Sequence, residues 1–224
     1  MKRREFSLGL SSALTAGALT FPAARAQTST PATVQGKPPV AGTDFLPLAK
    51  PAPLDTPAGK IEVIEFFWYS CPHCNAFEPA LDAWVKRAPK DVVVKRVPVA
   101  FQDSFAPQQR LYFALEAMGL VDKLHAKVFH AIHVERQRLD QPEAIFEWIA
   151  KQGVDKAKFI DQFNSFSASS KLRRATQLQD AYKVEGVPAM GVAGRFYTDG
   201  TLGKSMERVL YVVDYLIGEV RKGR

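Results

Sequence analysis

The sequence predicts an α/β fold in which a block of helices separates two groups of strands. The stretch "KIEVIEFFWY" (60–69) is rich in β-branched and aromatic residues, which is typical of a largely buried strand, and "DVVVKRVPVAF" contains a second β-branched strand from about Val92 to Val99. Between residues 104 and 182, apolar residues instead recur at helical spacing. Strand-like sequence then returns in "GVPAMGVAGRFYTDG" (186–200). Together these observations indicate an α/β domain with a helical insertion.

The first two strands are expected to flank a helix and form a βαβ unit. We expect this helix from about Pro72 to Arg87, because its apolar residues fall on one face: Phe77, Leu81, Trp84 and Val85. The sequence before residue 60 is rich in proline and leaves room for one short edge strand near residues 44–48.

The helical block is expected to contain four or five helices. Pro107 suits a helix start and Gly119 a helix end. After the block, the returning strands should form a hairpin that turns near Ala193–Gly194. Ser205 is a suitable cap for a final helix, because its hydroxyl can accept a bond from a free N–H of the first turn.

The first 26 residues have the three parts of an export signal. Lys2, Arg3 and Arg4 precede an apolar run, and small residues surround a cleavage site after Ala26. We expect export by the general secretory or the twin-arginine route to the bacterial periplasm, an oxidising space that permits disulfides. A proline-rich lead over residues 27–43 is expected to be extended or disordered.

The charge of the chain argues against nucleic-acid binding. The formal net charge is +7, but part of the excess lies in the export signal and the rest is spread along the predicted helices. A nucleic-acid-binding surface needs basic residues clustered on one face. No segment after the signal is long and apolar enough to suggest a membrane span.

The chain has only two cysteines, and they form the motif Cys71-Pro72-His73-Cys74 at the junction of the first strand and its helix. Residues three apart in a helix have Cα atoms roughly 5 Å apart, which suits an unstrained disulfide. Such a bond closes a very short loop and restrains little of the unfolded chain. Its value is therefore expected to be chemical.

The surroundings of Cys71 favour its thiolate. A sulfur at a helix start faces the free N–H groups of the first turn, and Pro72 fits the first helical position without losing a hydrogen bond. His73 can donate a hydrogen bond or a positive charge to the same sulfur. These effects lower the pKa of Cys71, which stabilises the reduced form and makes the disulfide a strong oxidant.

Three other interpretations of the cysteine pair are a zinc site, haem attachment and a structural disulfide. A zinc site needs further ligands, and the spacing of His130 and His133 does not match a zinc finger. Haem attachment needs a histidine directly after the second cysteine, where Asn75 stands. An inert structural disulfide remains open, although the short loop argues against it.

The motifs "EFFWYSCPHC" and "EGVPAMGV", with the helical block between them, resemble the DsbA family of periplasmic thiol:disulfide oxidoreductases. The resemblance implies a thioredoxin-like fold in two parts, residues 44–103 and 181–224, with a helical insertion over 104–180. It implies no cofactor besides the redox-active disulfide and no metal.

The resemblance also implies roles for single residues. Cys71 would be the exposed nucleophile that forms a mixed disulfide with substrate, and Cys74 the buried partner that resolves it. Pro72 completes the motif, and His73 would stabilise the Cys71 thiolate. Val187 and Pro188 would form a cis-proline loop that binds extended substrate. Glu65 would relay a proton to Cys74, and Lys95 on the neighbouring strand would be its countercharge. From their positions beside the two motifs, and not from the resemblance, we expect Trp68, Tyr69 and Gly191 to line the substrate surface.

The activity implied is donation of the Cys71–Cys74 disulfide to newly exported proteins with free cysteines. A membrane quinone-linked partner of the DsbB type would restore the disulfide, and the protein would act as a monomer. Alternatives are an isomerase or reductase of the same fold, or a binding module that holds metal or acts as a peptide-binding holdase.

Overall fold

The computed structural model describes residues 37–223. The expected export signal and most of the proline-rich lead lie outside these residues and stay predictions. Within the described range, no helix combines the length and the apolar character needed to cross a membrane.

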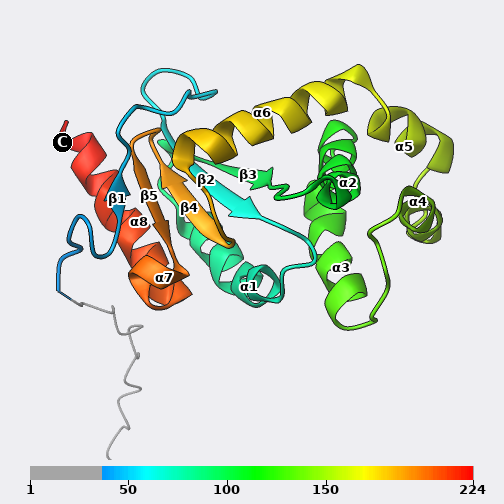
Figure 1. The fold of residues 1–224 in the computed structure, drawn as a ribbon, viewed down its shortest axis with the longest axis horizontal. Helices are drawn as coiled ribbons and strands as arrows, with labels where there is room; N and C mark the ends of the chain where they lie inside the picture. The colour runs from blue at the N-terminus through cyan, green and yellow to red at the C-terminus, as the bar shows by residue number, and fades with distance from the viewer. Residues whose placement is uncertain (1–36, 224) are drawn as a thin grey trace, which may run out of the picture. The chain divides into compact units, whose positions relative to one another are not determined.

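A five-stranded mixed sheet lies at the centre of the fold (Figure 1), with the strand order β1-β5-β4-β2-β3. Strands β2 and β3 run parallel, and the other neighbouring pairs run antiparallel. The strands are β1 (Leu46–Pro47), β2 (Ile61–Phe67), β3 (Val92–Pro98), β4 (Ala189–Val192) and β5 (Phe196–Asp199). The predicted short edge strand, the buried strand β2, the second strand β3 and the hairpin are all present, with β3 partly buried at the other edge of the sheet.

Helix α1 (Pro72–Arg87) connects β2 to β3, which confirms the predicted βαβ unit. Five α-helices fill the predicted helical block: α2 (Ala106–Ala117), α3 (Val121–His133), α4 (Pro142–Lys151), α5 (Lys156–Phe163) and α6 (Phe166–Tyr182). The sequence did not predict two short elements, η1 (Asp103–Phe105) and α7 (Gly200–Gly203). Helix α8 (Met206–Arg221) begins after Ser205, whose hydroxyl accepts a bond from the Arg208 N–H as predicted.

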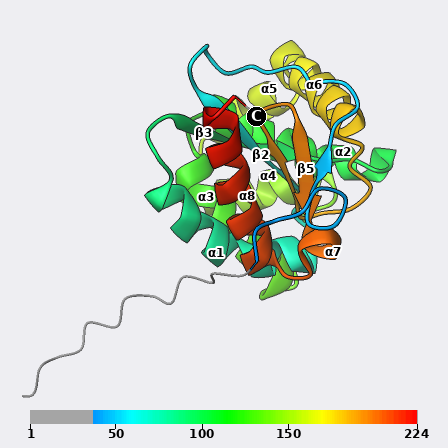
Figure 2. The same cartoon turned by 90° about the vertical axis from the view of Figure 1, so that its left-hand side faces the viewer.

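The two faces of the sheet are covered by different helices (Figure 2). Helices α1 and α8 pack on one face, and α6 packs on the other. Successive side chains of a strand point to opposite faces. Val63 of β2 therefore packs in the core beneath α1 and α8, and Ile64 packs in the core beneath α6. Both faces of β2 are therefore buried, which explains its nearly continuous apolar sequence.

The hairpin between β4 and β5 turns at the predicted residues. Ala193 has φ 54° and Gly194 has φ 66°, the pair of left-handed residues that suits a tight hairpin. A side chain at Gly194 would also meet the carbonyl oxygen of Ala52, at 2.6 Å from an ideal Cβ. Glycine is therefore required there by both conformation and space.

Two of the residues expected to line a substrate surface are buried, so that expectation was wrong for them. Gly191 lies in β4 under the ring of Tyr182, and Tyr69 is 1% exposed. Trp68 is half-buried and stacks on Phe105 with ring centroids 3.9 Å apart. The division of the chain into two thioredoxin-like parts and an insertion stays a prediction.

Candidate active site

Cys71 occupies the N-cap position of α1, as the motif predicted, but it is only 7% exposed, so the expectation of an exposed cysteine was wrong. Its Sγ accepts a hydrogen bond from the backbone N–H of Cys74 at 3.4 Å, and Pro72 is the first helical residue. Hydrogen bonding from Cys74, from its thiol and its backbone N–H, lowers the pKa of Cys71 to about 6, helped by the backbone and positive charge of His73. The helix start therefore favours a thiolate at this sulfur.

Cys74 lies one turn inside the helix and has no exposed surface. Burial, together with the neighbouring Cys71, raises the pKa of its thiol well above the usual range. Both cysteines are free thiols in this structure. Two sulfurs in one short motif thus have opposite acid–base properties because one faces the helix end and the other the core.

The segment Val187–Pro188 faces Cys71 across the site, and its peptide bond is cis, as the resemblance implied. The thiol of Cys71 donates to the Val187 carbonyl oxygen at 3.4 Å. Exposed His73 lines a pocket of about 350 Å³ together with Val187, Pro188 and the start of α7. The pocket thus shares Val187 with the reactive sulfur, because the carbonyl oxygen of this residue accepts from Cys71.

Glu65 lies in β2 with no exposed surface, and its Oε2 accepts a bond from Arg96 Nε at 3.0 Å. Its Oε1 has no hydrogen-bond partner among the described residues. Burial and the charge of Glu78 raise the pKa of Glu65 to about 8, although Arg96 opposes the shift. Glu65 is thus a carboxyl group that holds a proton near neutral pH, and when it is ionised its charge raises the pKa of Cys74.

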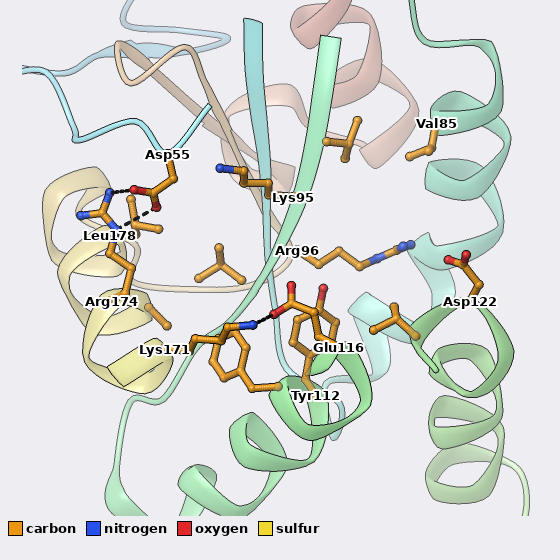
Figure 3. A pocket seen from close by; sticks show the side chains of 15 residues that line it. Asp55, Val85, Lys95, Arg96, Tyr112, Glu116, Asp122, Lys171, Arg174 and Leu178 are labelled. Carbon is orange, nitrogen blue, oxygen red and sulfur yellow. Dashed lines mark hydrogen bonds and ion pairs between the residues drawn. The ribbon is translucent and has the colours of Figure 1, made fainter. Parts of the chain in front are cut away.

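The prediction that Lys95 is the countercharge of Glu65 was wrong. In the parallel register of β2 and β3, Glu65 lies beside Arg96, and Lys95 lies beside Ile64. Adjacent strand residues point to opposite faces, so Lys95 reaches the other face, where its Nζ binds Glu62 Oε2 at 2.7 Å. Figure 3 shows Lys95 and Arg96 leaving β3 on opposite sides within a pocket of about 540 Å³.

Sequence reasoning missed the residues that surround Glu65. Arg96 also binds Glu78 Oε2 at 2.8 Å and Asp82 Oδ1 at 2.9 Å, so one guanidinium serves three carboxylates. Glu78 in turn contacts His125 of α3, with Nε2 and Oε1 3.3 Å apart. The sequence did contain one sign of this cluster: Glu78 lies on the apolar face of the predicted helix, and a buried carboxylate needs partners.

Two side chains of the helical block hold the chain just before Cys71. Gln108 accepts from the Ser70 N–H at 3.2 Å and donates to the Ser70 Oγ at 2.7 Å and to the Leu139 carbonyl at 3.0 Å. His133 Nε2 lies 2.8 Å from the Tyr69 carbonyl oxygen and therefore donates to it. The position of the motif thus depends on contacts from the helical block.

Within residues 37–223, no three His, Cys, Asp or Glu side chains form a group that could hold a metal ion. Comparisons with known proteins agree with the geometry. Residues 95–210 match the model of a family described as a DSBA-like thioredoxin domain. A thiol:disulfide interchange protein DsbA from Bordetella parapertussis is 50% identical over 179 residues, which cover 80% of this chain and 85% of that protein.

The chain belongs to the DsbA family. The DsbA of Burkholderia cepacia is 42% identical, over 82% of this chain and 86% of that protein. The crystal structure of Pseudomonas aeruginosa DsbA matches with a TM-score of 0.78 and 40% identity, covering 82% of this chain and 95% of that one. These matches confirm the thioredoxin-like fold and establish the protein as a DsbA-type thiol:disulfide oxidoreductase.

Proposed function

We propose that the protein oxidises exported proteins with free cysteines by passing them its Cys71–Cys74 disulfide. The observation that carries this proposal is the contrast between the two sulfurs. Cys71 is a stabilised thiolate at a helix start beside a pocket, and Cys74 is a buried thiol of raised pKa. A protein that stabilises its own reduced form in this way gives up its disulfide readily.

The reaction proceeds through a mixed disulfide. A substrate thiolate attacks Sγ of Cys71, and the bond between Cys71 and Cys74 breaks as Cys74 takes the electron pair. A second substrate thiolate then attacks the substrate sulfur of the mixed disulfide, and Cys71 leaves as a thiolate. The substrate loses two electrons and gains a disulfide, while the enzyme gains both electrons.

Glu65 is proposed to provide the proton that the departing Cys74 sulfur needs. A carboxyl group with a pKa of about 8 is mostly protonated at neutral pH, so it has a proton to give. Arg96, in place of the expected Lys95, is the cation that holds the Glu65 carboxyl in position. His73 is proposed to stabilise the Cys71 thiolate, and Val187 to offer backbone groups to an extended substrate segment.

The cellular setting is proposed from the sequence and the family. An export signal cleaved after Ala26 would deliver the protein to the periplasm by the general secretory or the twin-arginine route. A membrane quinone-linked reoxidase of the DsbB type would restore the disulfide, and the enzyme would act as a monomer.

The test is oxidative refolding of reduced ribonuclease A by the purified, oxidised protein. We expect the wild type to restore nuclease activity and Cys71→Ser to be inactive. With scrambled, disulfide-bonded ribonuclease A, the Cys71 thiolate of Cys74→Ser should attack a substrate disulfide, release one substrate thiolate and accumulate as a mixed disulfide. Equilibration with glutathione should give a reduction potential well above that of the glutathione pool. A potential near that of thioredoxin, about −270 mV, would contradict an oxidase and indicate a reductase.

A further inference from the structure

A buried histidine of the helical block lies next to the carboxylate cluster. His125 of α3 is 4% exposed and packs among four aromatic rings: Phe67, Tyr69, Tyr112 and Phe129. The thiol chemistry described above does not use this side chain. A polar ring in so apolar a place needs partners for both of its nitrogens.

Both nitrogens have such partners. Nδ1 lies 2.8 Å from the Tyr69 hydroxyl, and Nε2 lies 3.3 Å from Glu78 Oε1. An ionised carboxylate only accepts, so Nε2 carries the hydrogen, and Nδ1 then accepts from the Tyr69 hydroxyl. This arrangement fits a neutral imidazole, in agreement with burial, which lowers the pKa of His125.

The bond to Glu78 connects His125 with Glu65. The second oxygen of Glu78 accepts from Arg96, and the same guanidinium binds Glu65. Two carboxyl groups that share one cation in a buried site cannot both ionise easily, so one of them keeps a proton. A neutral donor on Glu78 stabilises the negative charge there and leaves the proton on Glu65.

We propose that His125 is a positioning residue that keeps Glu65 protonated by donating its Nε2 hydrogen to Glu78. This inference rests on the proposed function, because a protonated Glu65 is the proton source for Cys74. It gives the helical block a chemical part in the reaction, since α3 is the element that supplies the donor.

Other ionisable groups also face this cluster from the surrounding elements. Arg96 comes from β3, and the groups that contribute charge or titrate nearby are Cys74 and Asp82 of α1, Tyr69 of the loop before α1, and Tyr112 of α2. Among the described residues, the hydrogen bond to Glu78 Oε1 comes from His125, whereas Arg96 binds the other oxygen, Oε2. His125 is therefore the side chain to change.

The experiment follows the Glu65 carboxyl carbon by NMR in the reduced, full-length protein labelled with ¹³C at glutamate carboxyl groups. Glu65→Gln identifies the signal by removing it. His125→Phe keeps a ring in the aromatic cluster but has no hydrogen-bond donor. The pH at the midpoint of the Glu65 titration should therefore fall by about one unit, the size expected for the loss of a hydrogen bond to a charged group.

Three further variants test whether the effect passes through Glu78. His125→Gln keeps a hydrogen-bond donor, so its Glu65 titration midpoint should lie close to that of the wild type. Tyr69→Phe removes the other hydrogen bond of the imidazole and should leave the midpoint unchanged. In a Glu78→Gln background, His125→Phe should have no further effect, because the group through which it acts is gone.

An unchanged midpoint in His125→Phe, or an equal shift in Tyr69→Phe, would overturn the proposal. If His125→Phe does not fold, ¹⁵N NMR of the wild-type imidazole decides: hydrogen on Nε2 supports the proposal, and hydrogen on Nδ1 alone contradicts it. Neither titration uses a substrate. Failure of ribonuclease refolding with these NMR results intact would therefore count against the proposed function alone.

Discussion

At the scale of single residues, the site depends on where each thiol lies along one helix. Cys71 caps α1 and faces its N–H groups, whereas Cys74 is enclosed by the core. The same side-chain chemistry therefore gives a stabilised thiolate at one position and a protonated thiol at the other. Hydrogen bonding and burial, which have opposite effects on a thiol pKa, account for the difference.

The low pKa of Cys71 predicts a pH-dependent contribution to the stability of the reduced protein. The folded pKa of about 6 lies below the unfolded value of about 8.5, so the contribution is complete above pH 8.5 and disappears as the pH falls through 6. Between these limits it should change by at most about 1.4 kcal/mol per pH unit. Urea unfolding of reduced wild type and Cys71→Ser from pH 5 to 9 measures it.

Comparison with Cys71→Ser is needed because Glu65 has the opposite pH dependence. Its raised pKa means that folding is favoured at low pH and loses stability as the pH rises toward 8. Both proteins contain Glu65, so its effect cancels in their difference. If the two unfolding free energies ran parallel across this range, the Cys71 thiolate would not be stabilised by the fold.

At the scale of elements, the register between β2 and β3 decides which charges meet. Lys95 and Arg96 are consecutive basic residues, and either could match Glu65 in a sequence without a known register. A shift by one residue would exchange their faces and move Arg96 away from Glu65.

The packing of α6 on β4 predicts a cost for any side chain at position 191. An ideal Cβ at Gly191 would lie 2.4 Å from the Tyr182 ring, so Gly191→Ala must displace that helix or ring. We expect a loss of about 1–3 kcal/mol, typical of overpacking. Thermal unfolding should show a lower Tm, by about 2–4 °C for each kcal/mol.

The matched control is Gly218→Ala in α8. No atom lies within 4 Å of a Cβ built there, and the residue is inside a helix. Alanine should therefore raise stability by up to about 1 kcal/mol through helix propensity. If Gly191→Ala and Gly218→Ala both changed the Tm only slightly and by the same amount, Tyr182 would not pack against β4 as described.

At the scale of the whole molecule, the helical block holds the reactive motif in place. Gln108 of α2 binds Ser70 and Leu139, and His133 of α3 binds the Tyr69 carbonyl. The chain before Cys71 thus depends on two helices that follow it in sequence. Loss of these hydrogen bonds should therefore increase local opening of the chain around Ser70 and Cys71 more than it increases opening of the sheet.

Gln108→Leu tests this dependence. The substitution leaves the Ser70 N–H and the Leu139 carbonyl without their partner, which should cost about 1–3 kcal/mol. Hydrogen exchange at the Ser70 amide should become faster than in the wild type. Gln109→Leu is the control, because the neighbouring buried amide binds the Pro98 carbonyl at 2.8 Å instead and should not affect exchange at Ser70.

The sequence predicted the elements well and the charge pairs poorly, for physical reasons. Strand β2, helix α1 and the Ala193–Gly194 turn depend on local patterns of apolar and turn residues, which are visible in one chain. The partners of Glu65 depend on strand register and on helices far away in sequence, which one chain does not reveal. Arg96, Glu78 and His125 were missed for that reason.

The hydrogen bond between Cys71 and Val187 joins positions 116 residues apart. A chain that emerges with its N-terminus first therefore exposes both cysteines long before the segment opposite them exists. All five helices of the block must be synthesised before the site can be complete. The contact between Cys71 and the Val187 carbonyl can therefore form only late in the synthesis of the chain.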